Sequence, residues 1–199
     1  MVVSYLLHPL FIPLYVAFLI LYTNPSIEYV LSGFIRVRIL AMVALNTVLF
    51  PGLLVFLLWR LKFIPSLEME SRRDRYIPLV ANLLFYFWAW YVSRNLPQIP
   101  GELIQWLFGV FLSASIAMFI NIFRKVSLHA IGMGGLVGFL LWQQATTTVW
   151  PPNWMLPAAV LVAGITCTAR LSLNAHKASE VYVGFFAGMA AQALAGLMF

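Results

Sequence analysis

The chain has 199 residues, of which 63% are hydrophobic and only 9% are charged, and its mean hydropathy is +0.93. These values exclude a soluble globular domain, so the net charge of +6 indicates contact with anionic lipid head groups and does not indicate nucleic acid. The single cysteine, Cys167, excludes an internal disulfide and a cysteine-rich metal site. We therefore expect an integral membrane protein.

The uncharged stretches between charged residues measure the expected spans, because a membrane-crossing helix needs about 20 mostly apolar residues. Residues 38–60, 75–94, 102–124 and 180–199 each enclose about one span, and residues 125–170 enclose about two. Residues 2–22 are also long enough, and they lack the basic start and cleavage site of a signal peptide. The sequence predicts an all-α polytopic bundle of about seven transmembrane helices, or six if the first is interfacial, forming one domain over 1–199.

The first polar cluster is the loop 60–75, which is the most charged part of the chain. Its charged residues are Arg60, Lys62, Glu68, Glu70, Arg72, Arg73, Asp74 and Arg75. Such a loop is typical of a positive-inside anchor. Adjacent arginines can also present several donors to the oxygens of one phosphoryl group, so an anion clamp is the alternative.

The second polar cluster is Arg124 to Ala130. Residues 76–92 and 103–122 predict a helical hairpin, which returns the chain to the membrane face that holds Arg75. Ser127 is a natural N-cap, and the free N–H groups of the helix it opens would point toward His129. An anion would be stable at such a helix start.

The third polar cluster lies between two uncharged runs and contains Arg170, His176 and Glu180. If a helix begins near His176, Glu180 lies one turn further on the same face and can accept a hydrogen bond from Nδ1 of the imidazole. Nε2 would then be unprotonated, and Arg170 could bind an anionic oxygen. A turn at Pro151-Pro152 brings this cluster to the same face as the first two. The alternative is that these charges only solvate a helix end.

Small residues and one glutamine recur every fourth position after Glu180, at Gly184, Gly188, Gln192 and Gly196. The spacing continues the helix face that carries Glu180, which predicts that this face packs inward against other helices. Gly134 and Gly138 have the small-xxx-small spacing that lets helices approach closely.

The three clusters together resemble the motifs of the type 2 phosphatidic acid phosphatase and vanadium haloperoxidase superfamily. Arg170-x5-His176-x3-Glu180 is similar to its third motif, Ser-Arg-x5-His-x3-Asp, and Ser127-Leu128-His129 is similar to Pro-Ser-Gly-His. Residues 72–78 resemble a degenerate first motif, Lys-x6-Arg-Pro. The resemblance covers about 72–188, within an expected phosphatase-like core of 60–199. Glu180 replaces the family's Asp, Leu128 replaces its Gly, Ala169 replaces its Ser and Glu68 stands at the position of its Lys.

The resemblance implies a role for each residue, without a metal or other cofactor. His176 would attack phosphorus and form a phosphohistidine, Glu180 would orient it, and His129 would protonate the leaving oxygen and later activate water. The residues implied to hold the phosphoryl oxygens are Arg170, Arg75, Ser127, Leu128 and His129, with Arg72 or Lys125 supplying the charge of the missing Lys.

The function this predicts is that of a membrane phosphatase acting on a lipid phosphate or a prenyl pyrophosphate. Charge counts leave the membrane side open, and the resemblance favours an extracytoplasmic site in a bacterial inner membrane. One alternative is a non-catalytic relative that binds anionic head groups or a protein partner. Another is a small transporter that uses His176 and Glu180 as a proton relay. The sequence does not indicate an oligomeric state.

Overall fold

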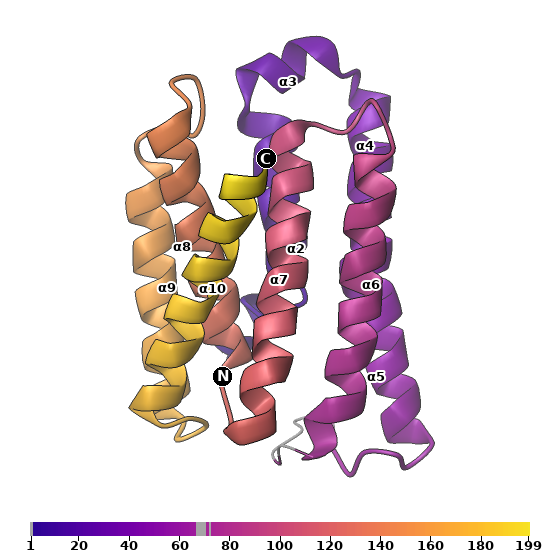
Figure 1. Ribbon diagram of the computed structural model, residues 1–199, viewed down its shortest axis with the longest axis vertical. Coiled ribbons are helices and arrows are strands. Elements are labelled where there is room, and N and C mark those ends of the chain that lie inside the picture. The colour runs from indigo at the N-terminus through magenta and orange to yellow at the C-terminus, as the bar shows by residue number, and fades with distance from the viewer. Residues whose placement is uncertain (1, 67–70, 72) are drawn as a thin grey trace.

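The computed structural model describes residues 2–66, 71 and 73–199, and all regular structure in these residues is helical (Figure 1). The longer helices lie roughly alongside one another. In chain order the helices are α1 (Val2–Leu6), α2 (Ile12–Thr23), α3 (Pro25–Val30), α4 (Gly33–Ala44), η1 (Leu45–Leu49), α5 (Phe50–Arg60), η2 (Arg73–Arg75), α6 (Tyr76–Arg94), α7 (Gly101–Phe123), α8 (Leu128–Thr146), α9 (Met155–Ser172) and α10 (Ala178–Met198).

Five helices within the described residues are long and apolar enough to cross a membrane: Gly33–Arg60, α6, α7, α9 and α10. Large apolar side chains remain exposed on them, among them Leu84, Phe119 and Leu161, as lipid contact allows. α8 has the same length as α6 but packs inside the bundle against α2, α7, α9 and α10. The expected polytopic helical membrane bundle is therefore confirmed.

The expected single span over residues 2–22 is wrong, because the chain breaks there into α1 and α2 (Figure 1). Pro9 lies in the break, and proline lacks the N–H that a continuing helix needs. α2 has 12 residues and is about 18 Å long, well short of the roughly 30 Å hydrocarbon layer. It is nevertheless deeply buried, with Ala17, Ile20 and Leu21 fully enclosed. One face of α2 is thus enclosed in the bundle, and the helix is too short to be an outer span.

The apolar segment Gly33–Arg60 is one long helix that contains a π-helical turn. α4 and α5 are continuous through η1, a single π-helical turn in which Asn46 and Thr47 are buried. Asn46 and Thr47 donate their side-chain hydrogens to the carbonyl oxygens of Met42 and Val43. The loop before this segment contains the short helix α3.

The small-residue face of α10 packs inward, as its four-residue repeat predicted, and the helix it packs against is α8. Gly184, Gly188 and Gly196 are buried, and a Cβ at Gly184 would lie 2.8 Å from the carbonyl oxygen of Ser127. A Cβ at Gly138 would lie 2.8 Å from Met189 Cα, so α8 is equally close to α10 from its own side. This contact places the start of α10 beside the start of α8.

Candidate anion-binding site

Three loops meet where α6, α8 and α10 begin, at the lower end of the bundle in Figure 1. Arg75 donates from Nη1 to the carbonyl oxygen of Val126 at 3.0 Å. Lys125 donates from Nζ to the carbonyl oxygen of Ala175 at 3.3 Å, and the Ser127 N–H donates to the carbonyl oxygen of Glu180 at 3.3 Å. These bonds join the three polar clusters that the hairpin topology placed on one face.

The turn between α9 and α10 holds Arg170 and His176 in place. Asn174 adopts a left-handed conformation with φ of 50°, which asparagine tolerates better than most residues. Its N–H donates to the carbonyl oxygen of Leu171 at 3.0 Å, and the N–H of Ala175 donates to that of Arg170 at 3.2 Å. This pair of bonds is a Schellman motif, which ends α9 and directs the chain back toward the cluster.

His176 and Glu180 form the hydrogen bond that their spacing predicted. Nδ1 of His176 lies 2.6 Å from Oε2 of Glu180, and the two side chains are 3% and 18% exposed. A carboxylate only accepts, so Nδ1 carries the hydrogen and Nε2 keeps its lone pair. His176 precedes α10, which begins at Ala178, so Glu180 reaches back from the first helical turn.

Ser127 is the N-cap of α8, as expected, because its Oγ accepts from the N–H of Ala130 at 3.4 Å. The residue is fully buried. His129, in the first turn, places Nε2 3.0 Å from the carbonyl oxygen of Ser4 in α1. A carbonyl oxygen only accepts, so Nε2 of His129 carries the hydrogen and Nδ1 is its basic nitrogen.

A cavity of about 1150 Å³ collects most of the expected site residues. We call it the site cavity; the expected residues that line it are Arg75, Lys125, Leu128, His129, Arg170 and His176. Ser127 and Glu180 do not line it: one caps α8 and the other stands behind His176. Arg72, expected to bind phosphate, and Glu68, at the motif's Lys position, lie outside the described residues. The assigned roles stay predictions, while the shared position of both imidazoles is a structural fact.

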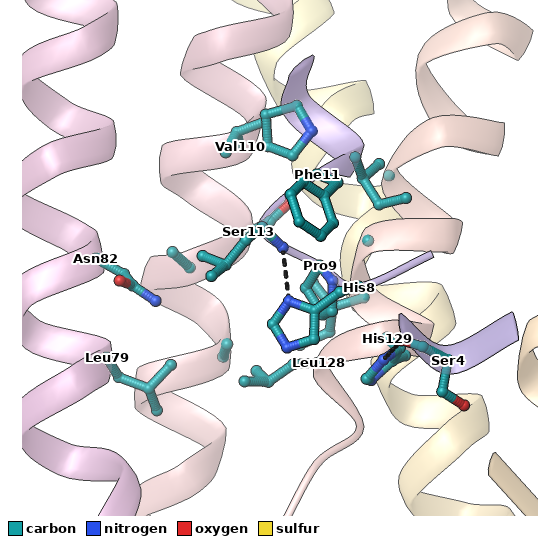
Figure 2. A pocket seen from close by; sticks show the side chains of 18 of the residues that line it. Ser4, His8, Pro9, Phe11, Leu79, Asn82, Val110, Ser113, Leu128 and His129 are labelled. Carbon is teal, nitrogen blue, oxygen red and sulfur yellow. Dashed lines mark hydrogen bonds between the residues drawn. The ribbon is translucent and has the colours of Figure 1, made fainter. Parts of the chain in front are cut away.

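The sequence interpretation missed several residues of the site cavity, above all His8. His8 lies in the break between α1 and α2, and its ring packs edge-on against that of His129 with 5.4 Å between ring centroids (Figure 2). A signal was present, because an ionisable residue inside an apolar run is a functional candidate by default. Asn82, Ser113 and Gln192 also line the cavity.

The charges around the cavity favour an anion. Arg75, Lys125 and Arg170 contribute three cationic side chains to its lining. Burial, together with the charges of Arg75 and Lys125, lowers the pKa of His176 below its ordinary value, although Glu180 opposes the shift. His176 is therefore neutral at pH 7 and its Nε2 is a nucleophile or base. In the described part of the chain, no three His, Cys, Asp or Glu side chains are grouped as metal ligands.

Comparisons of the chain with protein-family models, with curated proteins and with solved structures found no match.

Proposed function

We propose that the protein is a membrane-embedded phosphatase that hydrolyses a lipid phosphate or a lipid pyrophosphate through a phosphohistidine. The observation that carries the proposal is that one cavity is lined by His129, by His176 and by three cationic side chains. A phosphoryl group needs this chemistry: donors for its oxygens, a nucleophile, and a second group that handles the leaving proton. The motif resemblance supports the same assignment.

In the proposed reaction, the lone pair on Nε2 of His176 attacks phosphorus while the bond to the leaving oxygen breaks. Glu180 accepts the Nδ1 hydrogen and stabilises the positive charge that the imidazole gains. Arg75, Lys125 and Arg170 bind the phosphoryl oxygens, whose charge is greatest in the transition state. His129, protonated on Nδ1 as well as Nε2 before the attack, donates the Nδ1 proton to the leaving oxygen. Its freed Nδ1 then takes a proton from the water whose oxygen bonds to phosphorus as the bond from phosphorus to Nε2 of His176 breaks.

The position of the site at the helix ends supports a lipid substrate. The head group can enter the cavity while the acyl or prenyl chain stays in the hydrocarbon around the five spanning helices. Following the motif resemblance, we place the protein in a bacterial inner membrane with the site on the extracytoplasmic side. Protease protection of the loop 60–75 in oriented vesicles tests that side.

A second candidate function is binding of anionic head groups without turnover. It is favoured by Leu128, which stands at the glycine position of the second motif and lines the cavity, and by Ser127, whose hydroxyl caps α8. Nε2 of His129 is also engaged by the Ser4 carbonyl oxygen. A site built this way still holds an anion through its three cations.

The test is phosphate release by purified protein in detergent from phosphatidic acid, phosphatidylglycerol phosphate and a prenyl pyrophosphate. We expect release from at least one substrate, abolished separately by His176→Ala and by His129→Ala, with Lys177→Ala as an exposed neighbouring control. Release that survives the double substitution contradicts the proposed roles. Lipid phosphate that binds without turnover supports the second candidate.

A further inference from the structure

The N-terminal segment 4–8, which precedes every membrane-spanning helix, reaches into the site cavity at both of its ends. Ser4 and His8 line the cavity together with His129, although about 120 residues separate them in the chain. Figure 2 shows Ser4 beside the ring of His129 and His8 on its other side, facing Leu79 and Asn82 of α6. The break at Pro9 is what allows the segment to enter the bundle.

The hydrogen bonds of His8 define which ring nitrogen carries its hydrogen. The backbone N–H of Leu10 donates to Nδ1 of His8 at 3.4 Å, drawn as the dashed line in Figure 2. Nδ1 is therefore an acceptor, and the hydrogen of the neutral ring is on Nε2. Within residues 2–66, 71 and 73–199, the Nε2 of His8 has no hydrogen-bond partner. It is not sealed inside the protein either, because His8 lines the cavity.

The surroundings of His8 are those of an anion donor. Its ring lies edge-on to His129, and burial and the positive charge of Arg170 both lower the pKa of His8. The ring is therefore neutral at pH 7, and a neutral imidazole adds a directed N–H without adding charge. The Ser4 carbonyl oxygen, from the same segment, fixes the hydrogen of His129 on Nε2.

We propose that the segment 4–8 completes the anion site: His8 donates its Nε2 hydrogen to an oxygen of the bound oxyanion, and the Ser4 carbonyl oxygen orients His129. The resemblance to phosphatase motifs begins near residue 72 and gives no role to this segment. The inference rests on the proposed anion site but not on turnover, because it concerns binding. The ligand class is a tetrahedral oxyanion, either as a lipid head group or as free phosphate.

Two substitutions of His8 distinguish the effect of its N–H donor from the effect of its ring packing. His8→Phe keeps an aromatic ring against His129 and removes the donor, whereas His8→Gln removes the ring and offers an amide N–H at similar reach. The probe is inorganic phosphate, titrated calorimetrically into full-length protein in detergent. We expect His8→Phe to weaken binding about 10-fold or more, the usual loss for a hydrogen bond to a charged group, and His8→Gln to recover most of it. The same titrations with lyso-phosphatidic acid test whether the oxyanion can be a lipid head group. We expect the same ranking of affinities, with His8→Phe weaker than His8→Gln.

Arg170→Gln is the reference substitution, because it tests the anion site itself. If Arg170→Gln weakens phosphate binding and His8→Phe leaves it unchanged, the role of His8 is wrong and the anion site stands. If His8→Phe and His8→Gln weaken it equally, ring packing is responsible and the donor role is likewise wrong. If none of the three changes binding, the proposed site fails as a whole. Unfolding temperatures without phosphate show which variants are folded.

A spectroscopic readout tests the contact in the unaltered protein. The chain contains only three histidines, His8, His129 and His176, so ring-¹⁵N labelling gives spectra that single substitutions can assign. We expect saturating phosphate to move the Nε2 resonance of His8. Phosphate that moves the resonances of His129 and His176 but leaves that of His8 in place overturns the inference.

Discussion

Replacing Gly188 with alanine tests the helix contact on which the site is built. A Cβ at Gly188 would collide with the carbonyl oxygen of Ile131 and lie 2.7 Å from the backbone nitrogen of Gly135. Both are backbone atoms of α8, so neither can rotate away, and α10 has to move outward. Overpacking of this kind costs about 1–3 kcal/mol. The same movement separates the start of α10 from the start of α8.

Gly164→Ala is the matched control, because a Cβ on that α9 residue would have no heavy atom within 4 Å. Both substitutions gain the same helix propensity, so their difference isolates the crowding at Gly188. Thermal unfolding in detergent, followed by circular dichroism, should place the Tm of Gly188→Ala about 2–12 °C below that of Gly164→Ala. Equal Tm values would refute the close packing of α10 on α8.

Substitutions at three further residues test the site. Glu180→Gln removes the carboxylate that raises the pKa of His176, so this imidazole stays neutral to lower pH. In the pH profile of phosphate release, the acid limb should therefore move to lower pH, and the rate on the plateau should fall about 100-fold or more. An acid limb that does not move would mean that protonation of His176 does not set it. Ser127→Ala should lower stability by about 0.5–2 kcal/mol because the cap of α8 is lost, and an unchanged Tm would contradict the capping role. Asn174→Ala should cost about 1 kcal/mol because of its left-handed φ, while Asn174→Gly should be neutral in the same assay; equal effects of Ala and Gly would contradict the turn.

The parts of the fold that sequence could predict are those governed by short-range rules. The length of apolar stretches identified the five candidate spanning helices of the described residues, although it also predicted a span over residues 2–22 that does not form. Pro151-Pro152 identified a hairpin turn. The His176–Glu180 hydrogen bond followed from a four-residue spacing, and Ser127 followed from its preference for helix starts. Each of these depends on residues a few positions apart, whose relative geometry the backbone largely fixes.

The parts that sequence could not predict depend on contacts between distant residues. Residues 2–22 are as apolar as a spanning helix, and the burial of the short α2 comes from its packing against α4, α7 and α8. The contact of Ser4 with His129 joins residues 125 positions apart, a separation no local pattern encodes. His8 carried a signal by its chemistry, but the histidine it meets in the site, His129, is far from it in the chain. Its place in the site follows from the break at Pro9.

The most direct measurement of the proposed mechanism is the search for a covalent phosphoenzyme. Protein mixed with a lipid phosphate and quenched within milliseconds should carry one phosphoryl group on the peptide that contains His176, stable in alkali and labile in acid as a phosphoramidate is. His129→Ala should make this label both form and decay more slowly, because His129 acts in both steps, and His176→Ala should remove it. Phosphate release without any label on His176 would contradict the mechanism.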